Sequence, residues 1–160
     1  MILSTLTPEL NFALEQLSHR RLGQLCELRF RRGRPVTGVF PWGEELIYRN
    51  GQPIAVNEAL LKTLLDRATS CSPYALRMEE TGRYLPLENG CRMGLCGETV
   101  LRDGKIHGLR HISSLVIRFA REIPGAADGA IPYLTQGGQL SSALILSPPG
   151  GGKTTFLRDL

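Results

Sequence analysis

Apolar residues recur at helical spacing in two segments of the chain. The first segment begins at Thr7-Pro8-Glu9, where a hydroxyl at the N-cap, a proline in the first turn and an acid near the positive end of the helix dipole favour a helix start. Its apolar face contains Leu10, Ala13, Leu14 and Leu17. The second segment begins at Asn57, and its apolar face contains Leu60, Leu61, Leu64, Leu65 and Ala68. These patterns predict two helices, and a third, shorter helix is expected over residues 74–80.

Alternating polar and apolar positions predict strands between and after these helices. Cys26, Leu28 and Phe30 alternate with Glu27, Arg29 and Arg31, which is typical of a strand with one buried face. Further strand segments are predicted over residues 36–47, with an interruption at 41–43, and over residues 83–87, 92–101, 105–111 and 114–121. The pairs Asn50-Gly51, Asn89-Gly90 and Asp103-Gly104 adopt the positive φ of two-residue hairpin turns readily.

The order of these elements predicts two domains. Residues 1–122 are expected to form an α+β domain of helices and antiparallel hairpins, and residues 123–141 a linker with helical character over 125–134. Residues 142–160 open with Ala143-Leu144-Ile145-Leu146-Ser147, an apolar run typical of a buried parallel strand. We expect this last segment to be the first strand, loop and helix start of an α/β P-loop domain that the chain does not complete.

A glycine-rich loop follows the predicted strand. It reads Ser147-Pro148-Pro149-Gly150-Gly151-Gly152-Lys153-Thr154-Thr155 and leads into an apolar helix start at Phe156 and Leu157. This is the context of a Walker A loop, although its first position, usually glycine, is serine here. The alternative is a simple turn between a strand and a helix in which the lysine is only solvated. Three consecutive glycines followed by Lys-Thr-Thr favour the phosphate site.

The residue types of this loop suit a nucleoside triphosphate. Glycines let the backbone curl closely around phosphate oxygens, so the expected N–H donors run from Gly150 to Thr155. Lys153 supplies positive charge for the β- and γ-phosphates, and the Thr154 hydroxyl is a ligand for Mg²⁺. The predicted binding residues are Ser147, Gly150, Gly151, Gly152, Lys153, Thr154 and Thr155, with ATP and Mg²⁺ as cofactors and Thr154 as the metal ligand.

The chain offers no candidate for the remaining catalytic groups. Only five residues follow Thr155, whereas each parallel neighbour of a P-loop strand needs a crossover of about a dozen residues or more. An acidic partner for Mg²⁺ and a group that orients water are therefore expected outside these 160 residues. We expect this chain alone not to hydrolyse ATP, and its catalytic residues stay unassigned.

Arginines are concentrated near the first predicted strand. Lys and Arg number 19 against 15 Asp and Glu, which gives a net charge of +4. The cluster consists of Arg20, Arg21, Arg29, Arg31, Arg32 and Arg34. It is either a patch for nucleic acid or an anionic membrane, or the polar face of a strand offset by nearby acids, or a contact for an acidic partner subunit. The small net charge and the lack of interleaved aromatic residues other than Phe30 argue against nucleic acid.

Two further arginines close the first predicted domain. Arg118 and Arg121 lie just before the linker, where in a two-domain ATPase they are possible phosphate contacts, in their own subunit or in a neighbour. The alternative is surface charge on an edge strand. His107 and His111 have no accompanying base and nucleophile, and we expect them to be structural.

Composition indicates a globular cytoplasmic protein. No apolar run reaches the roughly 18 residues of a membrane-spanning helix. Residues 1–14 carry no cation, so a signal peptide and a transmembrane segment are not expected. Cys26, Cys71, Cys91 and Cys96 lack zinc-binding spacing and are predicted to be free, mostly buried thiols.

Several of these segments together resemble the stage III sporulation protein AA family of endospore-forming bacteria. The likeness is densest in Cys91-Arg92-Met93-Gly94-Leu95-Cys96-Gly97, in residues 109–118 and in the glycine-rich loop, and it includes Glu27-Leu28-Arg29-Phe30-Arg31. That family is similar to the traffic ATPases of type II and type IV secretion. The resemblance implies a RecA-like motor that continues beyond Leu160, with Ser147 as the family's own loop variant. It also implies a homo-hexamer in the mother-cell cytoplasm, docked on membrane proteins of the channel that joins mother cell and forespore.

Two functions of other classes stay open at the level of sequence. One is a nucleic-acid-binding P-loop ATPase that uses the Arg20 to Arg34 cluster. The other is a non-catalytic module that docks partners and holds no nucleotide. Salt-dependent binding of DNA or RNA distinguishes the first, and titration with Mg·ATP distinguishes the second.

Overall fold

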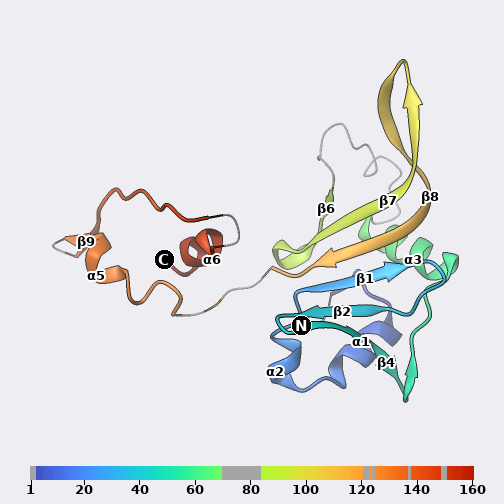
Figure 1. Cartoon of the computed structure of the whole chain (residues 1–160), viewed down its shortest axis with the longest axis horizontal. Coiled ribbons are helices and arrows are strands. Elements are labelled where there is room, and N and C mark those ends of the chain that lie inside the picture. The colour runs from blue at the N-terminus through green and yellow to red at the C-terminus, as the bar shows by residue number, and fades with distance from the viewer. Residues whose placement is uncertain (1–2, 70–83, 121–122, 124, 137, 149–150) are drawn as a thin grey trace. The chain divides into compact units, whose positions relative to one another are not determined.

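The computed structural model describes residues 3–69, 84–120, 123, 125–136, 138–148 and 151–160. The chain divides into two compact units, residues 1–120 and residues 121–160. Each unit is described by itself (Figure 1).

The first unit is built on an antiparallel sheet. Its six described strands are β1 (Glu27–Arg31), β2 (Thr37–Phe40), β3 (Gly43–Leu46), β6 (Tyr84–Pro86), β7 (Arg92–Arg102) and β8 (Lys105–Arg118). They lie side by side in the order β3-β2-β1-β8-β7-β6. A two-stranded ribbon of β4 (Tyr48–Arg49) and β5 (Gln52–Pro53) follows β3 in the chain. With the helices below, this confirms the predicted α+β class for the N-terminal part.

Both helices that were predicted from long apolar stripes are present. Helix α1 spans Pro8–Glu15, and the Thr7 hydroxyl accepts a hydrogen bond from the Leu10 N–H at 3.4 Å. Helix α3 spans Glu58–Ala68, and the Asn57 side chain accepts one from the Leu60 N–H at 2.8 Å. These side-chain acceptors satisfy N–H groups that have no partner within the helix. A short helix, α2 (His19–Leu22), was not predicted, and the helix expected over residues 74–80 lies outside the described residues.

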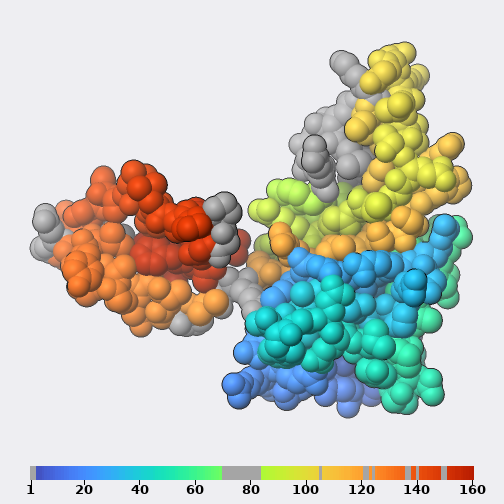
Figure 2. Space-filling model, in the orientation of Figure 1, coloured from blue at the N-terminus to red at the C-terminus, as the bar shows by residue number. Residues whose placement is uncertain are grey.

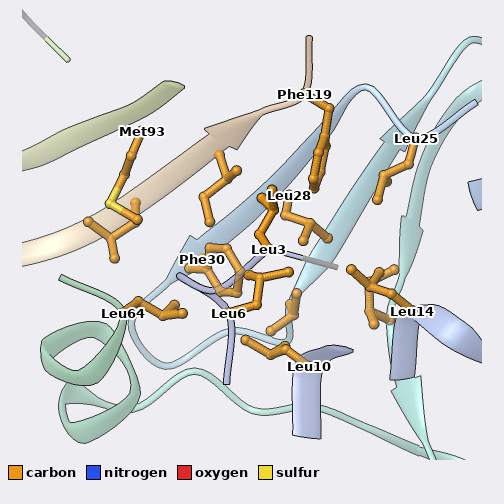
Figure 3. Close-up of a cluster of buried hydrophobic side chains, with 14 of the residues drawn as sticks. Leu3, Leu6, Leu10, Leu14, Leu25, Leu28, Phe30, Leu64, Met93 and Phe119 are labelled. Atoms are coloured by element: carbon orange, nitrogen blue, oxygen red, sulfur yellow. The ribbon is translucent and has the colours of Figure 1, made fainter. Parts of the chain in front are cut away.

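One face of the sheet carries the core. Leu28 and Phe30 of β1 and Leu115 and Ile117 of β8 are fully buried, and the register places Leu28 beside Ile117 and Phe30 beside Leu115. Figure 3 shows Leu28 and Phe30 among leucines of the N-terminal segment, α1 and α3. Because side chains alternate along a strand, the same register leaves the charged residues of β1 on the opposite face.

Two of the predicted turns, at an Asn-Gly pair and an Asp-Gly pair, join neighbouring strands as expected. Asn50 and Gly51 between β4 and β5 have φ of 50° and 77°, and Asp103 and Gly104 between β7 and β8 have φ of 53° and 74°. Both central residues are left-handed, which matches the right-handed twist of the flanking strands.

Strand β8 differs from its prediction. Residues 105–111 and 114–121 were predicted as separate strands, but Lys105–Arg118 is one continuous strand with an irregularity where it passes Gly97. Cys96 pairs with Ser114 and Glu98 with Arg110, so three residues of β8 lie opposite this glycine. His111, inside that bulge, has a φ of 48°. Beyond it β7 and β8 continue as a ribbon that projects from the sheet (Figures 1 and 2).

The described cysteines are free thiols, as predicted. Cys91 is buried, Cys26 is half-buried and Cys96 is exposed on β7. Cys71 lies outside the described residues. Fewer of them are buried than the composition suggested, because Cys96 lies on the open face of the sheet.

The second unit contains short elements only. They are α5 (Ile131–Leu134), β9 (Thr135–Gln136), β10 (Gln139–Leu140) and α6 (Lys153–Asp159). The strand predicted over residues 143–147 is absent, and Leu144 and Leu146 are 83% and 82% exposed. A strand needs a neighbour to pair its backbone groups, and the described part of this unit places none beside these residues. The first strand expected of a truncated P-loop domain is therefore not formed in the described residues.

Candidate functional site

An open hollow lies at the start of α6, where the glycine-rich loop ends. Gly151, Gly152, Lys153, Thr154 and Thr155 line it, and its volume is about 270 Å³. Pro149 and Gly150 lie outside the described residues, so the predicted donor at Gly150 has no structural account. The structure brings Gly151, Gly152, Lys153, Thr154 and Thr155 together around one hollow. Ser147 is not among the residues that line it, but it accepts hydrogen bonds from Lys153.

The Lys153 side chain turns back into this loop. Its Nζ donates to the carbonyl oxygen of Ser147 at 2.7 Å, to the carbonyl oxygen of Pro148 at 3.1 Å and to the Ser147 hydroxyl at 3.2 Å. All three acceptors are neutral oxygens. No carboxylate among the described residues pairs with this ammonium group, which is therefore available to an anion that offers stronger acceptors.

Gly151 is at a position where a side chain does not fit. A Cβ atom there would lie 2.6 Å from the Ser147 hydroxyl oxygen and 3.0 Å from the Pro148 carbonyl oxygen. Gly152 caps α6 with a φ of 82°, which an L side chain rarely adopts. Glycine is therefore favoured at these two positions for different reasons, which are steric at Gly151 and conformational at Gly152.

The first turn of α6 supplies the remaining groups. The Phe156 N–H donates to the Gly152 carbonyl at 2.9 Å, which closes the first helical turn. The N–H groups of the residues before it have no acceptor within the helix. Thr154 is exposed and Thr155 is half-buried. Backbone donors, one ammonium group and one accessible hydroxyl thus surround the hollow.

The arginine predicted as a phosphate contact is bonded on the first unit. The Arg118 Nε donates to Oε1 of Glu27 at 3.0 Å, while the Arg118 side chain stays 73% exposed. Oε2 of the same carboxylate accepts from Nε and Nη2 of Arg29 at 3.1 and 2.9 Å. Arg121, the second predicted contact, lies outside the described residues.

Acidic residues accompany much of the arginine cluster. Arg29 also bonds Glu44, and Arg21 bonds Glu45. Arg32 lies 4.0 Å from the carboxylate of Glu58. These contacts support the interpretation of the cluster as the charged face of a strand, offset by acids, and they weaken the case for a nucleic-acid patch.

We expect replacement of Glu27 by glutamine to destabilise the first unit by about 1 kcal/mol, because Glu27 is only 13% exposed and bonds two arginines. The matched control is Glu98→Gln, whose partner Arg110 and own side chain are 66% and 59% exposed. Exposed pairs contribute little, so the control should be nearly neutral. Urea unfolding measures both changes, and equal effects would contradict the role assigned to Glu27.

Two residues that the structure brings forward were not predicted in these roles. Glu27 was expected on the polar face of a strand, as one of the acids that offset the arginines, and Asp159 was not singled out. Asp159 accepts hydrogen bonds from the N–H groups of Gly125 and Ala127, which lie 34 and 32 positions earlier. Contacts at that separation leave no local signal in the sequence.

The described residues contain neither a metal cluster nor a membrane-spanning helix. No group of three or more His, Cys, Asp or Glu side chains there is arranged to hold a metal ion. No helix among them is long and apolar enough to cross a membrane.

Comparison with known proteins identifies a sporulation protein. A family model described as "Sporulation stage III, protein AA" matches residues 2–160. The chain is 36% identical over 163 residues to "Stage III sporulation protein AA" of Bacillus subtilis (strain 168), covering 99% of this chain and 50% of that relative. No solved structure matches. The chain belongs to the sporulation stage III, protein AA family, and it spans about half the length of the curated relative.

Proposed function

We propose that this chain is the N-terminal portion of a sporulation-associated ATPase of the secretion type, and that the whole ATPase binds Mg·ATP at the loop of residues 147–155. The Lys153 ammonium carries the proposal, because it lies against three neutral oxygens at the edge of a hollow lined by Gly151 to Thr155. A triphosphate tail offers this group anionic oxygens in place of carbonyls and a hydroxyl, and charged acceptors form the stronger hydrogen bonds.

The residues of the loop fit this cofactor. The missing Cβ of Gly151 lets the loop close on Ser147, and the first-turn N–H groups of α6 are donors without helical acceptors. Lys153 would neutralise phosphate charge, and Thr154, whose side chain is exposed, would hold Mg²⁺ through its hydroxyl. The Arg118 side chain is 73% exposed, and we propose it, together with Arg121, as an additional cation for the phosphates of its own or of a neighbouring subunit.

The apolar residues before the loop favour a larger second domain. Leu144 and Leu146 are almost fully exposed, and in a P-loop domain the side chains of such a strand are covered by helices packed on the faces of the parallel sheet. We propose that residues 143–147 become a central strand of a RecA-like sheet in a protein with the length of the curated relative. The assembly proposed with it is a cytoplasmic homo-hexamer that energises the channel between mother cell and forespore through membrane partners.

Calorimetric titration with Mg·ATP tests the proposal on the protein expressed over its whole reading frame. We expect binding at one site per chain, weakened when Mg²⁺ is removed by a chelator, because Thr154 then has no ion to hold. The 160-residue chain alone is expected to bind negligibly, since residues 143–147 have no sheet to fix the loop. A folded whole protein that leaves ATP unbound would instead support a docking module without nucleotide.

A further inference from the structure

The carboxylate of Asp159 connects two distant parts of the second unit. Its Oδ1 accepts from the Gly125 N–H at 3.1 Å and its Oδ2 accepts from the Ala127 N–H at 2.8 Å. Asp159 is the last residue of α6, and the two amides belong to the turn near the start of the unit. Both oxygens of one ionised group are thus used on one short stretch of backbone, and such bonds are among the stronger ones.

The turn that receives this carboxylate is well defined. Gly125 has a φ of 83°, and Ala127 is fully buried. The Ala127 carbonyl accepts from the Ala130 N–H at 2.8 Å and from the Ile131 N–H at 3.1 Å, which leads directly into α5. The bonds to Asp159 therefore fix a compact turn.

The other end of the same helix lies at the phosphate loop. α6 begins at Lys153, and its seven residues form a rod of about 10 Å. A short helix moves as one body, so a shift of its first turn is also a shift of Asp159. Gly125 follows the end of the first unit, Ala120, by only five residues. Through Asp159, α6 thus contacts the turn that lies near the start of the second unit.

We propose that Asp159 is a positioning residue that transmits nucleotide binding at the phosphate loop to the entry turn at residues 125–127. This inference rests on the proposed function, because it takes the loop to be filled by Mg·ATP. When Lys153 and the first turn of α6 close on phosphate, the Asp159 carboxylate carries the displacement to the two amides that it holds. The turn at residues 125–127 then moves with the state of the loop.

Hydrogen exchange on the whole protein tests the contact first, without nucleotide. The amides of Gly125 and Ala127 should exchange slowly in the parent protein. In Asp159→Asn they should exchange about tenfold faster, because an amide group offers one oxygen where the carboxylate offers two and carries no charge. The matched control is Asp128→Asn, which removes a carboxylate from the same turn and leaves both bonds of Asp159 in place. Equal exchange in parent and Asp159→Asn would overturn the inference.

The second measurement repeats the experiment with Mg·ATP. Exchange at residues 125–127 should change by about fivefold or more in the parent and in Asp128→Asn. By calorimetry Asp159→Asn should still bind Mg·ATP, but its exchange at residues 125–127 should no longer change with nucleotide. A merely structural role of Asp159 would not produce this combination. A response equal to the parent's would overturn the inference. If the parent itself does not bind ATP, the proposed function fails and the transmission fails with it, while the first measurement still reports on the contact.

Discussion

Replacing Lys153 by alanine, in the protein expressed over its whole reading frame, is expected to weaken Mg·ATP binding by about a hundredfold, or about 2.8 kcal/mol. The side chain brings the one cation of the loop, and its Nζ lies within 3.2 Å of three oxygens at the site. Alanine would remove this charge from the loop and leave the backbone donors and the Mg²⁺ proposed at Thr154. Calorimetry with Mg·ATP measures the loss.

The fold itself should survive this change. Among the described residues Lys153 bonds only oxygens of residues 147 and 148, and the carbonyls that the change frees belong to residues that are half-buried or exposed. Arg158→Ala is the matched control, because it removes an exposed cation from the last turn of the same helix. If Lys153→Ala binds ATP as tightly as Arg158→Ala does, the loop is not a phosphate site.

The sequence predicted those elements whose signals are local. The helix starts at Thr7 and Asn57 are encoded in a capping residue and an apolar stripe within one or two turns, and both are confirmed. The strand at Glu27–Arg31 was predicted from strict alternation, and one of its faces is buried. The turn at Asp103-Gly104 was predicted from two residues.

Elements that depend on distant partners were not predictable in this way. The apolar run at residues 143–147 has the composition of a buried strand, yet composition does not supply the neighbour that makes it one. The continuity of β8 depends on where β7 lies opposite it, which no periodicity in β8 alone reveals. The contact of Asp159 with Gly125 was not predictable for the same reason, because the two bonded groups are far apart in the chain.

Replacing Gly97 by alanine is expected to destabilise the first unit by about 3 kcal/mol, the largest stability effect that we predict. A Cβ at this position would lie 2.7 Å from the Arg110 carbonyl oxygen and 3.2 Å from Cα of Ile112. Both are backbone atoms of the β8 bulge, so no side-chain rotation relieves the overlap. Either the bulge shifts or the pairing of β7 with β8 is lost at this point.

Gly94→Ala provides the matched comparison on the same strand. A Cβ there would lie 3.9 Å from the Val116 carbonyl oxygen, which is an ordinary contact. Alanine also loses less backbone entropy than glycine on folding, so this variant should be neutral or slightly stabilised. Urea unfolding of the two variants beside the parent measures the difference. Equal stability of both variants would mean that β8 accommodates the methyl group by moving, and that its bulge is not fixed by the close approach of Gly97.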